Sequence, residues 1–176
     1  MIRKYRKKSY EFAEERGIFS SLTQSEIEEK YDFICREGWA RALGEAVVKI
    51  IFGPGVKIKQ MYLYNGYDME VHLNNGKIIK IEIKCRSYDE VFDEAAISAN
   101  DNKSGFIEEG DGWILEYYDK LDKWWIWDLK EYVPMFREKS YHHKKYTADH
   151  KNNYWVVEDA YYFDRSKATL SGTTYS

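Results

Sequence analysis

The sequence predicts a single α/β domain of 176 residues, and three observations lead to this prediction. Residues 39–52 carry apolar residues at helical spacing. Two neighbouring segments, 67–73 and 77–85, alternate apolar and polar residues, as half-buried strands do. Two further strand-like segments, 113–118 and 124–127, follow and predict a second hairpin. The order of helix, strand and hairpin places the chain in the α/β class.

The composition sets limits on the class of protein. Hydrophobic residues make up 44% of the chain and aromatic residues 17%, which is enough for a sizeable core. The formal net charge of −3 does not favour a general nucleic-acid-binding protein, although it allows a local basic patch. We find no apolar run long enough to span a membrane and no secretory leader, so we expect a cytoplasmic protein.

The N-terminal segment, residues 1–22, is rich in lysine and arginine, including Lys4. Two interpretations remain open for it: a solvated helix or arm, and an arm that contacts nucleic-acid phosphates. We assign residues 23–130 to the core of the domain. Residues 131–176 form a C-terminal extension and tail, whose Ser/Thr/Gly-rich end after Lys167 is expected to fray.

Two helices are predicted ahead of the strands. Residues 23–26, Thr-Gln-Ser-Glu, match a capping box, so a helix is expected to start there and to end or kink at Gly38. The second helix covers residues 39–52, and four residues form its apolar stripe: Trp39, Leu43, Val47 and Ile50. Glu45 lies off that stripe, so it is either a surface glutamate in helical ion pairs or a carboxylate that faces the hairpin.

The loop of the first hairpin, Asn-Asn-Gly at residues 74–76, decides which residues face one another. A two-residue turn would put the apolar faces of the two strands on opposite sides of the sheet. A three-residue loop with Gly76 in a left-handed conformation instead pairs Leu73 with Lys77. All apolar residues then share one side, and the remaining pairs are Glu70 with Lys80, Asp68 with Glu82, Val71 with Ile79, Met69 with Ile81 and Tyr67 with Ile83.

The predicted pairing brings two carboxylates together. Like charges directly opposite one another are destabilising, and a divalent cation between Asp68 and Glu82 would relieve the repulsion. Carboxylate oxygens suit Mg²⁺ or Mn²⁺. Lys84 projects from the same face and could activate a water molecule or stabilise charge on a phosphate. The alternative is an ordinary hairpin with a charged, solvated face.

Three segments resemble the PD-(D/E)xK nuclease superfamily. They are GWARALGEAVVKIIF with Glu45, GYDMEV with Asp68, and IEIKCR with Glu82 and Lys84. The resemblance covers residues 39–86, with a weaker match in ISAND followed by WILEYY. The residue before Asp68 is Tyr67, where the motif that names the family has proline.

This resemblance implies a restriction-endonuclease-like fold, a mixed central β-sheet flanked by α-helices, to which this chain adds an aromatic-rich C-terminal hairpin and helix. It implies a metal-dependent DNA endonuclease that hydrolyses phosphodiester bonds. Asp68 and Glu82 would bind Mg²⁺ or Mn²⁺, and Lys84 would position or activate the water. Glu45 would complete the metal ligands from the helix.

The partners expected from this reading are DNA, duplex or branched, and a second copy of the chain, because cutting both strands needs two active sites. Lys144 and Lys145 lie in a polar, basic and aromatic stretch with three histidines: His142, His143 and His150. That stretch is read as a DNA-contacting loop, a solvated loop or an HNH-type metal site. With Arg86 and Lys4, the two lysines are the predicted nucleic-acid contacts.

Two alternatives of other classes remain. The chain could have a nuclease fold that binds nucleic acid without cutting it. It could also be a protein-interaction domain whose aromatic C-terminal half packs against a partner, through residues such as Trp113, Trp124, Trp125, Trp127 and Trp155.

Overall fold

A computed structural model describes residues 2–91, 93–98, 106–107, 109–138, 143–149 and 155–174. The described helices are α1 (Ile2–Glu15), α2 (Gln24–Glu29), α3 (Tyr31–Phe52), α5 (Leu129–Glu138) and the 3₁₀ turn η1 (Arg165–Lys167). The described strands are β1 (Lys57–Gln60), β2 (Met69–His72), β3 (Ile78–Arg86), β4 (Glu94–Ser98), β5 (Trp113–Tyr118), β6 (Lys123–Asp128), β7 (His143–Asp149), β8 (Trp155–Asp164) and β9 (Leu170–Gly172).

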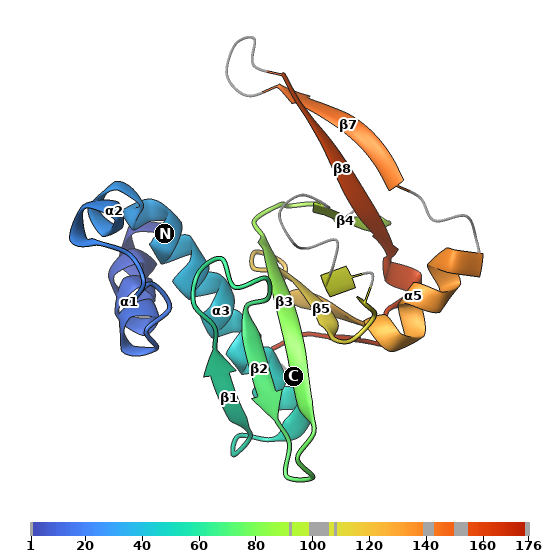
Figure 1. Cartoon of the computed structure of the whole chain (residues 1–176), viewed down its shortest axis with the longest axis horizontal. Helices are drawn as coiled ribbons and strands as arrows, with labels where there is room; N and C mark the ends of the chain where they lie inside the picture. The colour runs from blue at the N-terminus through green and yellow to red at the C-terminus, as the bar shows by residue number, and fades with distance from the viewer. Residues whose placement is uncertain are drawn as a thin grey trace.

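The centre of the molecule is a six-stranded mixed sheet with the strand order β1-β2-β3-β5-β6-β9 (Figure 1). Strands β3 and β5 run parallel, and the other neighbouring pairs are antiparallel. A separate three-stranded sheet has the order β4-β8-β7. The predicted α/β class, with a mixed sheet flanked by helices, is confirmed.

Each face of the central sheet carries its own core. On one face, Val47 and Val48 of α3 pack against apolar side chains of β2 and β3, including Met69, Ile81 and Ile83. On the other face, β4, β5, β6, α5 and the end of β8 share a second core, whose buried members include Ile97, Ile114, Trp127, Tyr132 and Phe163. The sheet is therefore buried on both sides along β5, so a charged residue there needs a partner.

The N-terminal helices differ from the prediction in their boundaries. Thr23 and Glu26 form the expected capping box, but α2 is only six residues long. Helix α3 continues through Gly38, where a Cβ would lie 2.1 Å from the carbonyl oxygen of Ser9 in α1. The predicted helix end at Gly38 is wrong, because the glycine lies inside α3 and allows the close approach of two helices. Ile50, predicted in the apolar stripe, is 50% exposed.

The hairpin register is confirmed from its loop up to Met69. Leu73 donates a backbone hydrogen bond to the Lys77 carbonyl, and Gly76 has a φ of 83°. The paired residues are His72 with Ile78, Val71 with Ile79, Glu70 with Lys80, and Met69 with Ile81. A three-residue loop therefore sets the pairing, as the pattern predicted.

Beyond Met69 the regular pairing stops. The Asp68 N–H donates to the Ile81 carbonyl, so Asp68 and Met69 both oppose Ile81, as in a β-bulge. The ring of Tyr67 stacks on Phe106 and packs against the second core. Tyr67 was predicted to lie on the same face of the sheet as Met69. This is wrong, because the extra residue of the bulge places Tyr67 on the opposite face.

Several C-terminal predictions are also corrected. The segment at residues 95–101 predicts a short helix after it, with Ser98 or Asn100 as the cap. Glu94–Ser98 form β4, residues 106, 107 and 109 are helical, and Asn100 is outside the described residues. Residues 143–149, expected in a loop, form β7, which pairs with β8 along its whole length. The predicted fraying after Lys167 is wrong as far as Thr174: β9 pairs with β6, and Thr174 donates a hydrogen bond to Asp122. Long-range strand pairing explains the differences at β7 and in the tail.

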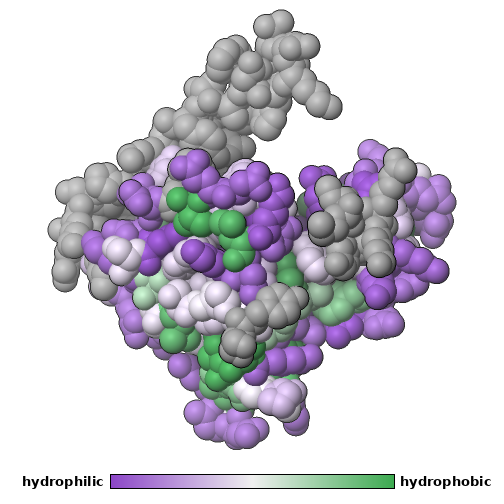
Figure 2. Space-filling model, turned by 180° about the vertical axis from the view of Figure 1, so that it is seen from behind, coloured by the Kyte–Doolittle hydropathy of each residue, from purple (hydrophilic) through white to green (hydrophobic). Residues whose placement is uncertain are grey.

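The surface seen from behind is largely hydrophilic at its periphery, with hydrophobic residues in several separate groups (Figure 2). The large hydrophobic side chains that stay exposed include Ile50, Ile78 and Leu170, from α3, β3 and β9. Scattered exposure of this kind is normal for a globular protein. Among the described residues, no helix combines the length and the apolar character needed to cross a membrane.

Candidate active site

Asp68 lies where β2 begins, and its carboxylate is held on both sides. One oxygen accepts a hydrogen bond from the Ile83 N–H at 2.7 Å, so the side chain replaces the backbone acceptor that the bulge removes from β3. The other oxygen accepts from Arg41 Nη2 at 3.2 Å. The bulge therefore aims the Asp68 carboxylate at β3 and α3 instead of at solvent.

The pKa of Asp68 is raised to about 7. Burial is the largest cause, and the negative charge of Glu82 is the second. Arg41 opposes both and lowers the pKa, Glu37 raises it, and the Ile83 hydrogen bond lowers it. Asp68 and Glu82 are not direct cross-strand partners, which differs from the predicted pairing. The two carboxylates are nevertheless close enough to repel each other, as predicted.

Glu82 and Lys84 share one face of β3. Lys84 Nζ lies 2.8 Å from Glu82 Oε1. The Glu82 side chain is 4% exposed, whereas Lys84 keeps 21% of its side-chain surface, so the pair is open to solvent on the lysine side. The structure thus brings three of the four predicted catalytic residues into one small region, namely Asp68, Glu82 and Lys84.

Arg41 is a site residue that the sequence analysis missed. Its side chain is almost fully buried, and it donates to the main-chain carbonyls of Met61 and Asp68. Its Nε also lies 3.5 Å from a carboxylate oxygen of Glu37. Arg41 therefore fixes α3 to the loop that ends in Asp68. A signal was present, since the buried residues Ile34, Gly38, Arg41, Glu45 and Val48 recur at helical spacing.

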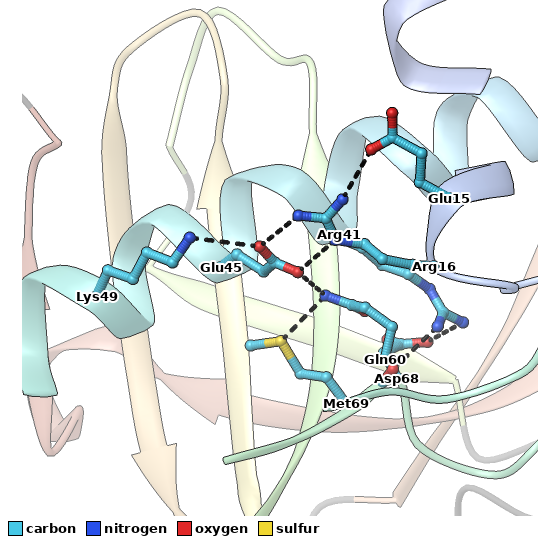
Figure 3. A network of polar contacts seen from close by, with 8 residues as sticks. All are labelled: Glu15, Arg16, Arg41, Glu45, Lys49, Gln60, Asp68 and Met69. Atoms are coloured by element: carbon cyan, nitrogen blue, oxygen red, sulfur yellow. Dashed lines mark hydrogen bonds and ion pairs between the residues drawn. The ribbon is translucent and has the colours of Figure 1, made fainter. Parts of the chain in front are cut away.

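Glu45 lies on the same helix but has other described partners (Figure 3). Arg16, just after α1, contacts both Glu45 oxygens, at 2.9 and 3.2 Å. Gln60 Nε2 of β1 donates to Glu45 at 3.1 Å, and Lys49 Nζ lies 3.6 Å away. Lys49 forms an i, i+4 ion pair with Glu45, but Glu45 is buried and is not the surface glutamate that one interpretation predicted. Arg41, one turn earlier in α3, contacts Glu37 and Asp68 instead. Glu45 thus joins α1, α3 and β1.

The predicted nucleic-acid contacts fall in three places. Arg86, at the end of β3, donates from Nε to Glu116 of β5 at 3.3 Å. The structure describes the backbone of Lys4 in α1 and of Lys144 and Lys145 in β7, but their side chains lie outside the described part. Two of the three histidines of that stretch, His142 and His150, also lie outside it. His72 faces Glu70, at 2.9 Å.

The donor set can be tested against a divalent metal. In the part of the chain that the structure describes, no group of three or more His, Cys, Asp or Glu residues is arranged to hold a metal ion. Mg²⁺ does not need such a group, because it binds through one or two carboxylates and keeps water molecules and substrate phosphates as its other ligands. The repelling carboxylates of Asp68 and Glu82 fit that requirement, since a cation would stabilise both in their charged form.

Comparison with known proteins adds a weak structural similarity. No family model and no curated protein matches the chain. Among solved structures, the chain is similar to a bacterial homing endonuclease, I-Ssp6803I, with a TM-score of 0.37 and 11% sequence identity. The match covers 53% of this chain and 65% of that enzyme's chain. At this level of similarity, function has to be argued from the site itself.

Proposed function

We propose that the protein is a metal-dependent DNA endonuclease of the PD-(D/E)xK type, which hydrolyses phosphodiester bonds at Asp68, Glu82 and Lys84. One observation carries the proposal. A buried carboxylate whose pKa is raised to about 7 lies beside a second carboxylate, and that second carboxylate contacts a lysine at 2.8 Å. Titratable groups perturbed by burial and by a specific charged neighbour are concentrated at functional sites.

Asp68 and Glu82 would hold Mg²⁺ or Mn²⁺. The bound ion would supply positive charge to a phosphate oxygen and lower the pKa of a bound water. Arg41 keeps Asp68 in place through its hydrogen bonds to the carboxylate and to the main chain. The third ligand implied by the resemblance, Glu45, remains a prediction, and it would have to loosen its contacts with Arg16 and Gln60 to serve.

Lys84 would act on the reacting groups themselves. Water adds to the phosphorus atom, one P–O ester bond breaks, and the leaving alkoxide takes up a proton. Lys84 Nζ, held by Glu82 and partly exposed, can hydrogen-bond the attacking water and stabilise the charge that develops on the phosphate. DNA, duplex or branched, is the proposed substrate, and a homodimer would supply the second active site for cutting both strands.

The decisive experiment measures plasmid cleavage with and without Mg²⁺. We expect Lys84→Ala to lower the cleavage rate at least 100-fold, which is the usual size of a lost charge-stabilising contact. Lys80→Ala is the matched control, because Lys80 lies on the same strand and pairs with Glu70 instead. Wild-type cleavage by a folded Lys84→Ala variant would refute the role of Lys84.

A nucleic-acid-binding protein that does not cut is the second candidate. It is favoured by the ionic contacts that already occupy Asp68, Glu82 and Glu45. Calorimetry separates the two candidates, since an endonuclease of this type binds Mn²⁺ at millimolar concentration and the alternative does not. The third candidate, a protein-interaction domain that packs its tryptophans against a partner, loses support. Trp124 and Trp127 are buried in the two cores of the protein itself.

A further inference from the structure

We propose that the loop between β1 and β2 binds an unpaired nucleobase, so that the protein acts on DNA that contains a single-stranded segment. The loop covers residues 61–67 and is called the tyrosine loop below, after its exposed residues Tyr62 and Tyr64. The inference rests on the proposed function in one respect, because it takes the substrate to be DNA. It narrows that substrate from duplex or branched DNA to DNA with unpaired bases.

The two tyrosines are the most exposed large hydrophobic side chains in the part of the chain that the structure describes. Tyr64 is 68% exposed and Tyr62 is 55% exposed. The other exposed side chains of this kind are spread over α3, β3, the segment after β3, and β9, whereas these two lie two positions apart in one loop. Exposed aromatic residues that gather in one place indicate an interaction surface, which single ones do not.

The tyrosine loop is anchored at the residue between the two tyrosines. Leu63 is 6% exposed and belongs to a third core, together with Ile18 and with Ile34 of α3. Its N–H donates to the Ile18 carbonyl at 2.8 Å. Because Leu63 points into this core, Tyr62 and Tyr64 on either side of it are directed to solvent.

The tyrosine loop is also tied to the candidate active site. The Met61 N–H donates to the Asp68 carbonyl at 2.9 Å, so the two ends of the loop lie side by side. Arg41, which holds the Asp68 carboxylate, donates to the Met61 carbonyl as well. Tyr64 precedes Asp68 by four residues, so their Cα atoms are at most about 14 Å apart. A nucleotide close to the phosphate that is cut therefore reaches Tyr64.

The backbone of Tyr64 is strained. Its φ is 67°, in the left-handed region that a bulky residue rarely adopts, whereas Asn and Gly adopt it more readily. The ring stacks on Phe33 of α3, with ring centres 6.4 Å apart, and Lys30 Nζ lies 5.6 Å from the centre of the same ring. These contacts orient the ring and leave most of its surface open. Strain that the surrounding structure maintains is concentrated at functional sites.

An open tyrosine ring suits a nucleobase. Every base has a flat aromatic face, and stacking on aromatic side chains binds single-stranded nucleic acid without reading its sequence. In a duplex the bases stack on one another, so an unpaired base is the one that presents its face. Lys30 also lowers the pKa of Glu26, so the exposed ring and not the lysine charge carries the inference. The competing occupant is a protein, either a partner or a second copy of this chain, since tyrosine is common at such interfaces.

Fluorescence anisotropy of the full chain in metal-free buffer tests the inference, with a labelled single-stranded oligonucleotide and the blunt duplex of the same sequence as probes. We expect the wild type to bind the single strand more tightly than the duplex. Tyr64→Leu removes the aromatic face and should weaken single-strand binding about tenfold, whereas Tyr64→Phe keeps the face and should stay within about twofold of wild type. Tyr88→Leu is the control, because Tyr88 is a 53% exposed tyrosine outside the loop. Equal affinities of the Leu and Phe variants, or a wild type that prefers the duplex, would overturn the proposal.

Tyr64→Asn separates binding from folding, because asparagine suits the left-handed backbone. We expect urea unfolding to show a variant at least as stable as wild type, with the same loss of single-strand binding. A less stable variant that keeps wild-type binding would show that Tyr64 serves only to pack on Phe33. A wild-type dimer that dissociates in Tyr64→Leu, with DNA binding unchanged, would assign the tyrosine loop to contacts with a second copy and overturn the proposal.

The result is separable from the proposed function. Unchanged single-strand binding in Tyr64→Leu, with intact Mg²⁺-dependent cleavage, overturns this inference alone. A loss of single-strand binding in Tyr64→Leu, in a protein that cuts neither plasmid nor single-stranded DNA, overturns the proposed function and leaves the stacking surface.

Discussion

At the scale of single residues, the Asp68 carboxylate is influenced by one positive side chain, Arg41, and one negative side chain, Glu82. Arg41 favours the charged carboxylate, while burial and Glu82 disfavour it, and the pKa of about 7 shows that the second pair of effects is larger. A proton and a divalent cation would therefore compete for the same carboxylate near neutral pH.

This competition predicts how stability depends on pH. The folded-state pKa of Asp68 is raised from 3.8 to about 7, so folding favours its protonated form. That contribution to the free energy of unfolding is complete below about pH 4 and is lost as the pH rises to 7. The loss is at most about 4 kcal/mol, since one pKa unit corresponds to 1.4 kcal/mol.

Urea unfolding at pH 5 and pH 7.5, with and without Mn²⁺, measures this effect. We expect Mn²⁺ to stabilise the protein at pH 7.5 and to do so far less at pH 5, where the proton occupies Asp68. The control is Asp111→Asn, because Asp111 is an exposed carboxylate distant in sequence from Asp68. Equal stabilisation by Mn²⁺ at both pH values would argue against a metal at Asp68.

At the scale of secondary-structure elements, α3 is the helix on which the site depends, and two glycines let it pack closely. Gly38 lies against the backbone of Ser9 in α1, and a Cβ at Gly44 would lie 2.5 Å from Ile83 Cδ1. Glycine inside a helix costs about 1 kcal/mol relative to alanine. Here the cost is offset, because α3 can approach α1 on one side and β3 on the other.

The close approach at Gly38 can be tested directly. A Cβ there would lie 2.1 Å from a backbone oxygen that no rotamer change can move away. We expect Gly38→Ala to lower the free energy of unfolding by about 1–3 kcal/mol, the usual cost of overpacking, despite the better helix propensity of alanine. Gly55→Ala is the control, because the space around Gly55 is open. Urea unfolding of both variants gives the comparison, and equal stabilities would contradict the packing argument.

At the scale of the whole molecule, the C-terminal end completes the central sheet. Strand β9 covers the edge of β6, and the Thr169 N–H donates to the Ile126 carbonyl at 2.7 Å. Further along, Thr174 donates from its backbone to Asp122, in the loop between β5 and β6. The last strand in the sequence therefore protects the edge opposite β1.

Deletion of residues 170–176 tests this closure. It removes β9 and the Thr174 contacts, so we expect a loss of about 2–4 kcal/mol, at about 1 kcal/mol for each buried hydrogen bond. Thermal unfolding measures the change. Deletion of residues 175–176 alone is the control and should leave the midpoint within about 1 °C of wild type. If the longer deletion behaves like the shorter one, the tail does not stabilise the sheet.

The parts of the fold that follow from local chemistry were predictable. Alternation with a period of two and a glycine in the loop determined the pairing of β2 with β3, and the capping box located the start of α2. The motif that places Glu82 and Lys84 two residues apart on one strand determined that they share a face. These signals operate within about ten residues, where spacing along the chain translates directly into position in space.

Only the tertiary structure decided the remaining parts of the site. The bulge at Asp68, the burial of Arg41 and the contacts of Glu45 with Arg16 and Gln60 depend on residues that lie 13 to 29 positions apart. The buried ion pair between Glu116 and Arg165 joins residues that lie 49 positions apart. Such contacts are set by how the helices and the second sheet pack onto the central sheet, and no periodicity within a single segment carries that information.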